Sequence, residues 1–117
     1  MERKELGSFG ENLALKFLKE RKYKVLCVNY RCRYGEIDIV TMERDTLVFV
    51  EVKTRSSEKY GKGMEAVDYR KQKKIRRIAV NYLSENAIAF SGIRFDVMDI
   101  TVRGDTPLQI DHIENAF

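Results

Sequence analysis

Two acidic residues and one lysine on neighbouring predicted strands could carry hydrolytic chemistry. Glu51 and Lys53 interrupt the otherwise apolar segment Leu47–Thr54, and they share one face because strand side chains alternate with period two. Asp38 lies on the preceding segment, Glu36–Met42. An unpaired charge is costly in a buried strand, so such groups usually pair with each other, bind a metal or react.

An antiparallel hairpin between these two segments would bring the two carboxylates together. With Glu43–Thr46 as a four-residue loop, Met42 lies opposite Leu47, and the constant sum of paired residue numbers places Asp38 opposite Glu51. Opposed side chains have Cβ atoms roughly 4.5–5.5 Å apart, and like charges this close repel unless a cation lies between them. The register therefore predicts that Asp38 and Glu51 share a cation.

The ligand chemistry indicates which cation this would be. Carboxylate and water oxygens suit Mg²⁺ or Mn²⁺, and Mg²⁺ commonly uses one or two protein carboxylates while phosphate and water complete its shell. Lys53, one pleat from Glu51, could hold a scissile phosphate or orient the attacking water. The three residues are thus candidates for metal-assisted phosphodiester hydrolysis.

The alternative interpretation of these charges is structural. In it, Glu36, Asp38, Glu51 and Lys53 form a salt-bridge ladder on a half-exposed hairpin, with Glu36 opposite Lys53. Apolar residues that continue the same face argue against this alternative, because they indicate that another element covers the face. These residues are Val40, Met42, Leu47 and Phe49.

Periodicity and turn signals predict the elements that position these residues. Apolar residues at helical spacing predict helices over residues 6–21 and Met64–Asn86. Thr54–Gly63, with two serines, two glycines and no periodicity, predicts a loop. β-branched and aromatic residues predict five strands, at Tyr23–Tyr30, Glu36–Met42, Leu47–Thr54, Ile93–Val102 and Leu108–Ile113. The order is helix, three strands, helix, two strands, which indicates an α/β fold.

Glu11, on the first predicted helix, has two interpretations. It flanks the apolar face of that helix by about 120°, at ~100° per residue, and could supply a further carboxylate to the site. Alternatively, Ser8 and Glu11 match a capping box, in which both side chains satisfy backbone donors at the start of the helix. Spacing alone leaves both interpretations open.

Positive charge is concentrated in one part of the chain. The protein has a net charge of +4, but residues 53–77 contain ten Lys and Arg against three Asp and Glu. On the second predicted helix, Lys71 falls within about 40° of Ile75, on the buried side, and so near the proposed metal. Candidate nucleic-acid contacts are Arg55, Arg70, Lys71, Gln72, Lys73, Lys74 and Arg77.

Such a basic patch could neutralise a phosphate backbone, with an affinity that falls as salt rises and without sequence information of its own. The alternative for Arg70, Lys73 and Arg77 is an ordinary solvated helix face. Lys71 and Gln72 are less easily explained in that way, because they lie toward the sheet.

The ordered motifs resemble a known nuclease superfamily. Gly35–Val40 followed by Val48–Arg55 is similar to the acid-then-ExK signature of the PD-(D/E)XK, or restriction-endonuclease-like, superfamily. More narrowly, the chain resembles the bacterial YraN family of uncharacterised proteins, which are similar to archaeal Holliday-junction resolvases. Further matching pieces extend the resemblance over almost the whole chain. They are Gly10-Glu11, Glu65-Ala66-Val67, Lys71-Gln72, Arg94-Phe95-Asp96-Val97 and His112–Phe117.

The resemblance implies a restriction-endonuclease-like αβββαβ core, with a mixed sheet flanked by helices. It implies Asp38 and Glu51 as metal ligands, Lys53 as the catalytic lysine and Glu11 as an additional acidic site residue. The proline that often precedes the first acid is replaced by Ile37. The superfamily also includes members that bind nucleic acid without cutting it.

Length and composition exclude several other classes of protein. The 117 residues, 44% hydrophobic with one proline, fit one domain over residues 1–117. Apolar runs reach only about four residues, so neither a membrane span nor a signal peptide is expected and the cytoplasm is the default location. Cys27 and Cys32 lack metal-site spacing and are expected to be reduced. With one histidine, His112, zinc sites and histidine-based triads are unlikely chemistry for this chain.

The sequence therefore predicts a Mg²⁺- or Mn²⁺-dependent nuclease-like protein that acts on DNA, with branched or structured DNA as the finer expectation. The alternatives are a catalytically silent nucleic-acid-binding module of the same fold and an interaction protein whose basic helix contacts an acidic protein partner. If the substrate is a symmetric junction, a homodimer is expected, because two active sites are needed.

Overall fold

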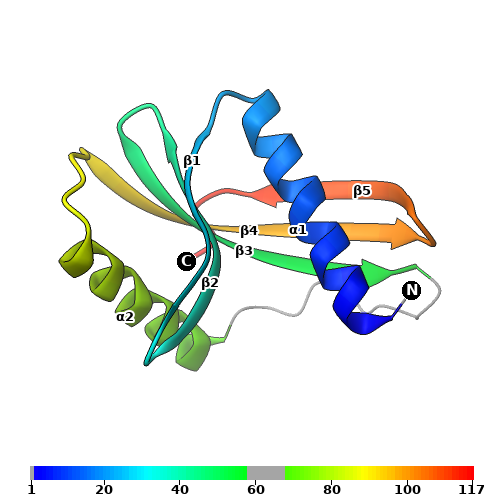
Figure 1. Ribbon diagram of the computed structural model, residues 1–117, viewed down its shortest axis with the longest axis horizontal. Coiled ribbons are helices and arrows are strands. Elements are labelled where there is room, and N and C mark those ends of the chain that lie inside the picture. Colours follow the sequence, from blue (N-terminus) through cyan, green and yellow to red (C-terminus); the bar gives the residue numbers. More distant parts are fainter. Residues whose placement is uncertain (1, 58–67) are drawn as a thin grey trace.

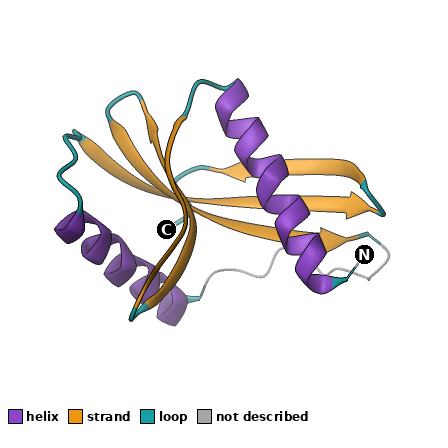
Figure 2. Ribbon diagram, in the orientation of Figure 1, coloured by secondary structure: helices purple, strands orange, loops and turns teal. Residues whose placement is uncertain are grey.

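The computed structural model describes residues 2–57 and 68–117, and it places one five-stranded sheet between two helices (Figure 1). The elements are α1 (Arg3–Glu20), β1 (Lys24–Cys32), β2 (Gly35–Glu43), β3 (Thr46–Ser56), α2 (Tyr69–Glu85), β4 (Gly92–Arg103) and β5 (Thr106–Ile113). Figure 2 shows α1 and α2 on opposite faces of the sheet. The predicted α/β architecture and element order are confirmed.

The sheet is mixed, with the strands in the order β1-β2-β3-β4-β5. All neighbours are antiparallel except β3 and β4, which are parallel. A parallel pair needs a crossover connection, and the chain segment that contains α2 provides it. β3 is the third of the five strands and has a neighbour on each side, and its residues Leu47–Val50 are buried.

Each face of the sheet has its own hydrophobic cluster. On one face, Ala14 and Leu18 of α1 pack against residues that include Val48 and Val50. On the other, Ile75 and Ile78 of α2 pack in a cluster with residues that include Phe49. Successive side chains of β3 point to opposite faces and thus contribute to both hydrophobic clusters. A charged residue in this strand must therefore lie on the face of one helix or the other.

The hairpin of β2 and β3 has the predicted register over most of its length. Met42 pairs with Leu47 and Val40 with Phe49, although the loop is shorter than predicted, with Arg44 and Asp45 between the paired strand ends. The ladder then ends at Ile39 and Val50. The prediction that it continues to the pairs Asp38–Glu51 and Glu36–Lys53 is wrong, because β2 curves away from β3 beyond this point (Figure 1).

Some predicted boundaries also differ from the structure. α1 begins at Arg3, three residues before the predicted start. Of the predicted loop Thr54–Gly63, the first residues continue β3 to Ser56, and residues 58–67 lie outside the described part of the chain. The predicted second helix starts at Tyr69, where the Asp68 side chain accepts a hydrogen bond from Lys71 N at 2.8 Å. Residues 64–67 of that prediction, including the Glu65-Ala66-Val67 motif, are likewise outside the described residues.

Neither helix among the described residues has the length and apolarity that crossing a bilayer requires. Cys27 and Cys32 are half-buried free thiols, as expected.

The C-terminal strands are held by a buried ionic network around Asp96 of β4. Its carboxylate accepts hydrogen bonds from Arg94 Nε and Nη2, both at 2.9 Å, and from Asn115 N at 3.0 Å. His112 Nε2 lies 2.7 Å from Asp96 Oδ2. Arg94 also reaches Tyr23 Oη at 2.8 Å, so the network connects the start of β1 to the last residues of the chain.

α1 approaches β3 very closely at Gly10. A Cβ atom on this buried glycine would lie 1.7 Å from Thr54 Oγ1 and 2.7 Å from Thr54 Cγ2, so no side chain fits without movement. We expect Gly10→Ala to lower the free energy of unfolding by about 1–3 kcal/mol, as overpacking does. Urea unfolding measures this change.

Gly7 is the matched control, because it lies on the same helix with nothing within 4 Å of its Cβ position. Gly7→Ala should stabilise the protein by roughly 0.5–1 kcal/mol through helix propensity. Thr54→Ala in the Gly10→Ala background should recover part of the loss. Equal stability of the two glycine variants would contradict the proposed close contact.

Candidate metal and nucleic-acid site

The candidate site lies in the fork where β2 separates from β3. Because the ladder ends at Ile39 and Val50, the backbone N–H of Val52 has no β2 carbonyl opposite it. Asp38 Oδ2 accepts this hydrogen bond instead, at 2.7 Å. The same side chain lies within hydrogen-bonding reach of Glu51. The structure therefore brings the two predicted metal ligands together, but through side-chain contacts and not as a ladder pair.

The environment of Asp38 disfavours its negative charge. Burial, the hydrogen bond with Glu51 and the charge of Glu51 raise the pKa of Asp38 to about 8, against the opposing effect of the Val52 N–H. Two carboxylates that meet in a partly buried place hold a proton or need a cation. A divalent metal would supply that positive charge, so the electrostatics fit the predicted ligand role.

Lys71 of α2 supplies positive charge to the same point. Its Nζ lies 2.9 Å from Glu51 Oε2, and the Glu51 side chain is 13% exposed. Burial acts to lower the pKa of Lys71, but the hydrogen bond and charge of Glu51 outweigh this effect, so that the pKa is raised. The Lys53 side chain lies close to that of Lys71. The placement of Lys71 near the two acids, predicted from the helical wheel, is what the structure shows.

Glu11 reaches the site from α1. Burial raises its pKa, with smaller contributions from the charges of Glu36 and Glu51, while a hydrogen bond from Asn29 opposes them. The capping-box alternative for Glu11 is wrong, because α1 begins at Arg3 and Ser8 is already inside the helix. The close packing at Gly10 explains how the adjacent Glu11 is held beside β3.

Asn29 is a site residue that no predicted motif included. It lies in β1 with a positive φ of 54°. With its amide nitrogen directed toward both acids, it donates to Glu11 Oε1 at 3.1 Å and to Glu36 Oε1 at 3.2 Å. Asn tolerates the left-handed region better than most residues, so this residue type suits the backbone conformation observed here.

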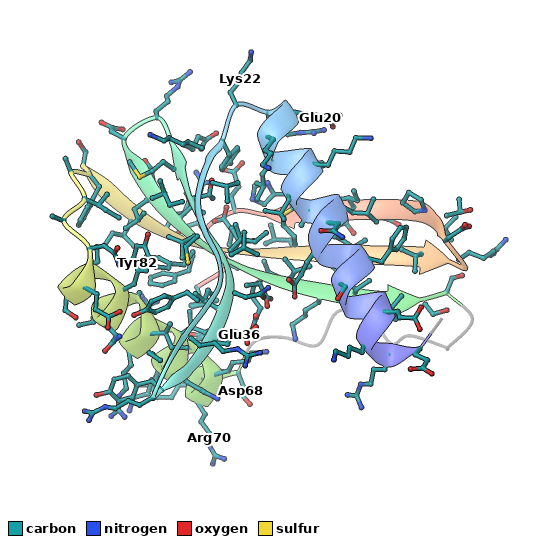
Figure 3. The ribbon with its side chains drawn as sticks, viewed as in Figure 1. Glu20, Lys22, Glu36, Asp68, Arg70 and Tyr82 are labelled. Atoms are coloured by element: carbon teal, nitrogen blue, oxygen red, sulfur yellow. The ribbon has the colours of Figure 1, made fainter. Side chains whose placement is uncertain are left out.

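The surface salt-bridge ladder is not the arrangement in the structure. Glu36 forms its ion pair with Arg31, at 2.6 Å, and Glu51 forms its ion pair with Lys71. Figure 3 shows Glu36 on the hairpin near Asp68 and Arg70 at the start of α2. These residues line a hollow of about 280 Å³ together with Glu51, Lys71 and Lys74. Glu36 and Glu51 of the hairpin thus face an open hollow whose other lining residues belong to α2 and its N-cap.

A metal would be held here by a small number of protein ligands. Within residues 2–57 and 68–117, no group of three His, Cys, Asp or Glu side chains is arranged to hold a metal ion. Asp38 and Glu51 still fit Mg²⁺ or Mn²⁺, because Mg²⁺ often binds to one or two carboxylates and takes its remaining ligands from phosphate and water. The raised pKa of Asp38 indicates that the ion pair of Lys71 with Glu51 does not offset the burial of this carboxyl group and the nearby charge of Glu51.

The predicted nucleic-acid contacts divide into three groups. Arg70, Lys73, Lys74 and Arg77 are exposed along α2, and all four line one hollow of about 280 Å³. Lys71 and Gln72 are half-buried, and Lys71 faces the acids. Arg55 lies further along β3, where it forms an ion pair with Asp99 of β4. The structure therefore brings four of the seven residues together on one surface.

The pKa of Asp38 predicts an unusual pH dependence of stability. The pKa of this carboxyl group is about 8 in the folded state and about 3.9 in the unfolded state. The folded state therefore binds more protons between these values, so stability falls as pH rises from about 4 to 8. Asp38→Asn removes this pH-dependent fall in stability, and the amide oxygen of asparagine can still accept the hydrogen bond from Val52 N–H. We expect the variant to exceed the wild type in free energy of unfolding at pH 8, by on the order of 1–3 kcal/mol, and to differ little at pH 5.

Urea unfolding in EDTA at the two pH values measures this difference. Asp45→Asn, in the exposed turn between β2 and β3, is the control for loss of a carboxylate without such an environment. An Asp38→Asn variant that is less stable than the wild type at pH 8 would contradict the assigned environment.

The mixed sheet between two helices, with acids at the fork of its central strands, has the architecture of a restriction-endonuclease-like fold. Residues 10–100 match the model of the uncharacterised protein family UPF0102, and the chain belongs to this family.

Relatives from distant bacteria match the chain over nearly its full length. It is 47% identical to a UPF0102 protein of Alkaliphilus oremlandii, over 97% of this chain and 98% of the relative. It is 49% identical to one of Geobacter metallireducens, over 97% and 93%. A UPF0102 protein of Caldicellulosiruptor bescii is 43% identical over the whole of both chains.

Proposed function

We propose that this protein is a metal-dependent nuclease of the PD-(D/E)XK superfamily that cleaves phosphodiester bonds in DNA. The observation that carries the proposal is the contact between Asp38 and Glu51 in a partly buried fork, next to Lys53 and opening toward the basic face of α2. Each part has a use in hydrolysis, since the acids attract a cation and the basic residues attract a phosphate backbone.

Asp38 and Glu51 would hold Mg²⁺ or Mn²⁺, which activates water and stabilises charge on a phosphate oxygen when bound. Lys53 would stabilise the negative charge that develops on the phosphate during in-line attack. Lys71 would be released from Glu51 to contact the DNA backbone. Glu11, held by Asn29, would orient a water molecule at the α1 side of the fork.

The proposed substrate is DNA with a branched or otherwise structured region, in the cytoplasm. A symmetric four-way junction would need two active sites, and a two-fold homodimer would provide them. The exposed cations of α2 would position the backbone, and branch geometry would supply the selectivity that phosphate contacts lack.

The test is cleavage of branched, single-stranded and blunt duplex DNA of matched sequence, with Mg²⁺, Mn²⁺ or EDTA. We expect products in the presence of either metal, none in EDTA, and none from Glu51→Gln. Metal-dependent products that persist unchanged in Glu51→Gln would overturn the assignment of the site.

A binding module of the same fold is the second candidate. Its supporting observation is the ion pair between Lys71 and Glu51, which already neutralises one of the two acids from within the chain. This candidate predicts salt-dependent DNA binding that is the same with and without Mg²⁺, and no products.

A further inference from the structure

A third hollow, the outer cavity, lies between α2 and the tip of the hairpin of β1 and β2, beyond the acidic site. It has a volume of about 600 Å³, within the ~300–1,000 Å³ range of small-ligand sites. Its lining residues are Tyr34, Arg76, Arg77, Val80, Asn81 and Ser84. The cavity thus combines an aromatic ring, an aliphatic side chain, two guanidinium groups and neutral polar groups.

Tyr34 stands between this cavity and the basic residues of α2. It lies at the tip of the hairpin between β1 and β2, and it also lines the neighbouring hollow that contains Arg70, Lys73 and Lys74. Arg33 Nη2 donates to Tyr34 Oη at 2.7 Å, and Arg77 Cζ lies 5.9 Å from the centre of the ring. The ring is therefore placed among cations at the boundary of two connected hollows.

The hairpin tip is fixed to α2 by the residue after Tyr34. A Cβ atom on Gly35, whose φ is 138°, would lie 2.6 Å from Lys74 Cε and 3.4 Å from Ile78 Cδ1. No ordinary side chain suits that backbone conformation or that space. Gly35 therefore lets the hairpin tip lie close against α2, which places Tyr34 over the helix.

The hollows form a path along α2. The acidic hollow and the basic hollow share Arg70 and Lys74, and the basic hollow and the larger cavity share Tyr34 and Arg77. From Lys71 to Ser84 this path follows about 20 Å of helix, at ~1.5 Å per residue. A strand whose phosphate lay beside Glu51 could thus continue past the cations and place a base in the outer cavity.

The chemistry of the outer cavity suits an unpaired nucleotide better than duplex DNA. Bases stack on aromatic rings only when they are free of their partner strand, and cationic side chains contribute beside such stacks. Val80, 67% exposed on an otherwise basic surface, extends the apolar contact area beside Tyr34. Asn81 and Ser84 place an amide and a hydroxyl group in the cavity lining.

We infer that this cavity binds an unpaired nucleotide of a single-stranded DNA segment, with its base stacked on Tyr34 and its phosphate held by Arg77 and Lys73. The inference rests on the proposed function for its substrate class, and it adds that the preferred DNA carries a single-stranded arm. The cavity selects that arm, and the acids at the fork act elsewhere on the same molecule.

The test compares Tyr34→Leu with Tyr34→Phe, because leucine keeps apolar packing against α2 and phenylalanine keeps the ring. Binding is measured in EDTA by fluorescence anisotropy, with a labelled single strand and a blunt duplex of the same length. We expect Tyr34→Leu to weaken single-strand binding by about 5- to 150-fold, the range for loss of one base–aromatic stack, and to change duplex binding less than about twofold. Tyr34→Phe should bind both DNAs nearly as the wild type does.

A second variant guards against loss of folding. Val80→Glu places a negative charge in the cavity from an exposed position, so it should weaken single-strand binding and leave the melting temperature unchanged. Equal single-strand affinity of the wild type and both Tyr34→Leu and Val80→Glu would overturn the inference, as would equal losses for single strand and duplex in Tyr34→Leu.

The outcomes separate this inference from the proposed nuclease activity. Selective loss of single-strand binding in a protein that yields no products would support the cavity and reject the cleavage. Metal-dependent cleavage by the wild type, with single-strand binding unchanged in Tyr34→Leu and Val80→Glu, would support the nuclease activity and reject the cavity. A wild type that binds neither DNA would reject both.

Discussion

Replacing Lys53 by methionine is expected to lower the rate of metal-dependent DNA cleavage by about 10²–10³-fold, as loss of one preorganised stabilising group does. Lys53 lies on β3 two residues from Glu51 and beside Lys71, so its ammonium group is positioned by a central strand. Methionine keeps an unbranched apolar stem, one atom shorter, and removes the ammonium group with its charge and hydrogen-bond donors. The expected loss is therefore in turnover.

Lys73→Met is the matched control, because Lys73 is exposed on α2 and lines the basic hollow away from the acids. It should raise KM and reduce the salt dependence of binding by about one phosphate contact, while kcat changes little. Single-turnover cleavage and anisotropy together separate the two effects. Equal kcat in Lys53→Met and the wild type would refute a catalytic role for Lys53.

Asp96→Asn is expected to cause the largest loss of stability, about 3–5 kcal/mol in free energy of unfolding. The Asp96 side chain has no exposed surface, and it pairs with Arg94 and contacts His112. Asparagine has nearly the same shape but leaves the guanidinium group of Arg94 without its principal buried counter-charge. Removal of one partner from a buried ion pair costs more stability than removal of one partner from an ion pair on the surface.

Asp111→Asn on β5 is the control for Asp96→Asn, since Asp111 is exposed and accepts hydrogen bonds from Gln109. Its effect should lie within about 0.5 kcal/mol. Urea unfolding at pH 7 measures both variants. Similar small losses in the two variants would show that the network around Asp96 contributes little.

The network also has a defined pH dependence. Burial alone would raise the pKa of Asp96, but hydrogen bonds from His112 and Arg94 outweigh it and hold the pKa below its ordinary range. The unfolded state therefore binds more protons, so this stabilisation is present above the unfolded pKa of about 3.9 and is lost as pH falls through the folded value. The pH dependence of stability that Asp96 contributes is opposite in sign to that of Asp38. Measurement of the free energy of unfolding of Asp96→Asn and Asp38→Asn across pH separates the two contributions.

Several parts of the site could be predicted from residue types and alternation. The hairpin register was correct as far as Ile39 and Val50, and it put Asp38 and Glu51 on adjacent strands one residue beyond that point. The helical wheel placed Lys71 toward the acids. The register up to Ile39 and the direction of Lys71 were predictable because they depend on the period of a strand or a helix, which neighbouring residues specify.

Other parts depended on contacts between distant segments. The bridge from Asn29 to Glu11 and Glu36 joins three elements, and the ion pair of Arg55 with Asp99 joins two neighbouring strands. The capping box at Ser8 was wrong because α1 extends further toward the N-terminus than its apolar pattern does. No spacing rule within one segment describes such contacts.

The sequence by itself determined the element order, the pairing of the hairpin as far as Ile39 and Val50, and the residue types that favour a divalent cation and phosphate. Only the tertiary structure decided that β2 leaves β3 at that point, so that Asp38 accepts the Val52 N–H and its carboxyl group acquires a raised pKa. The physical reason is that alternation fixes which face a side chain occupies, whereas strand curvature and the packing of α1 and α2 fix how far apart the charges lie and how much water reaches them.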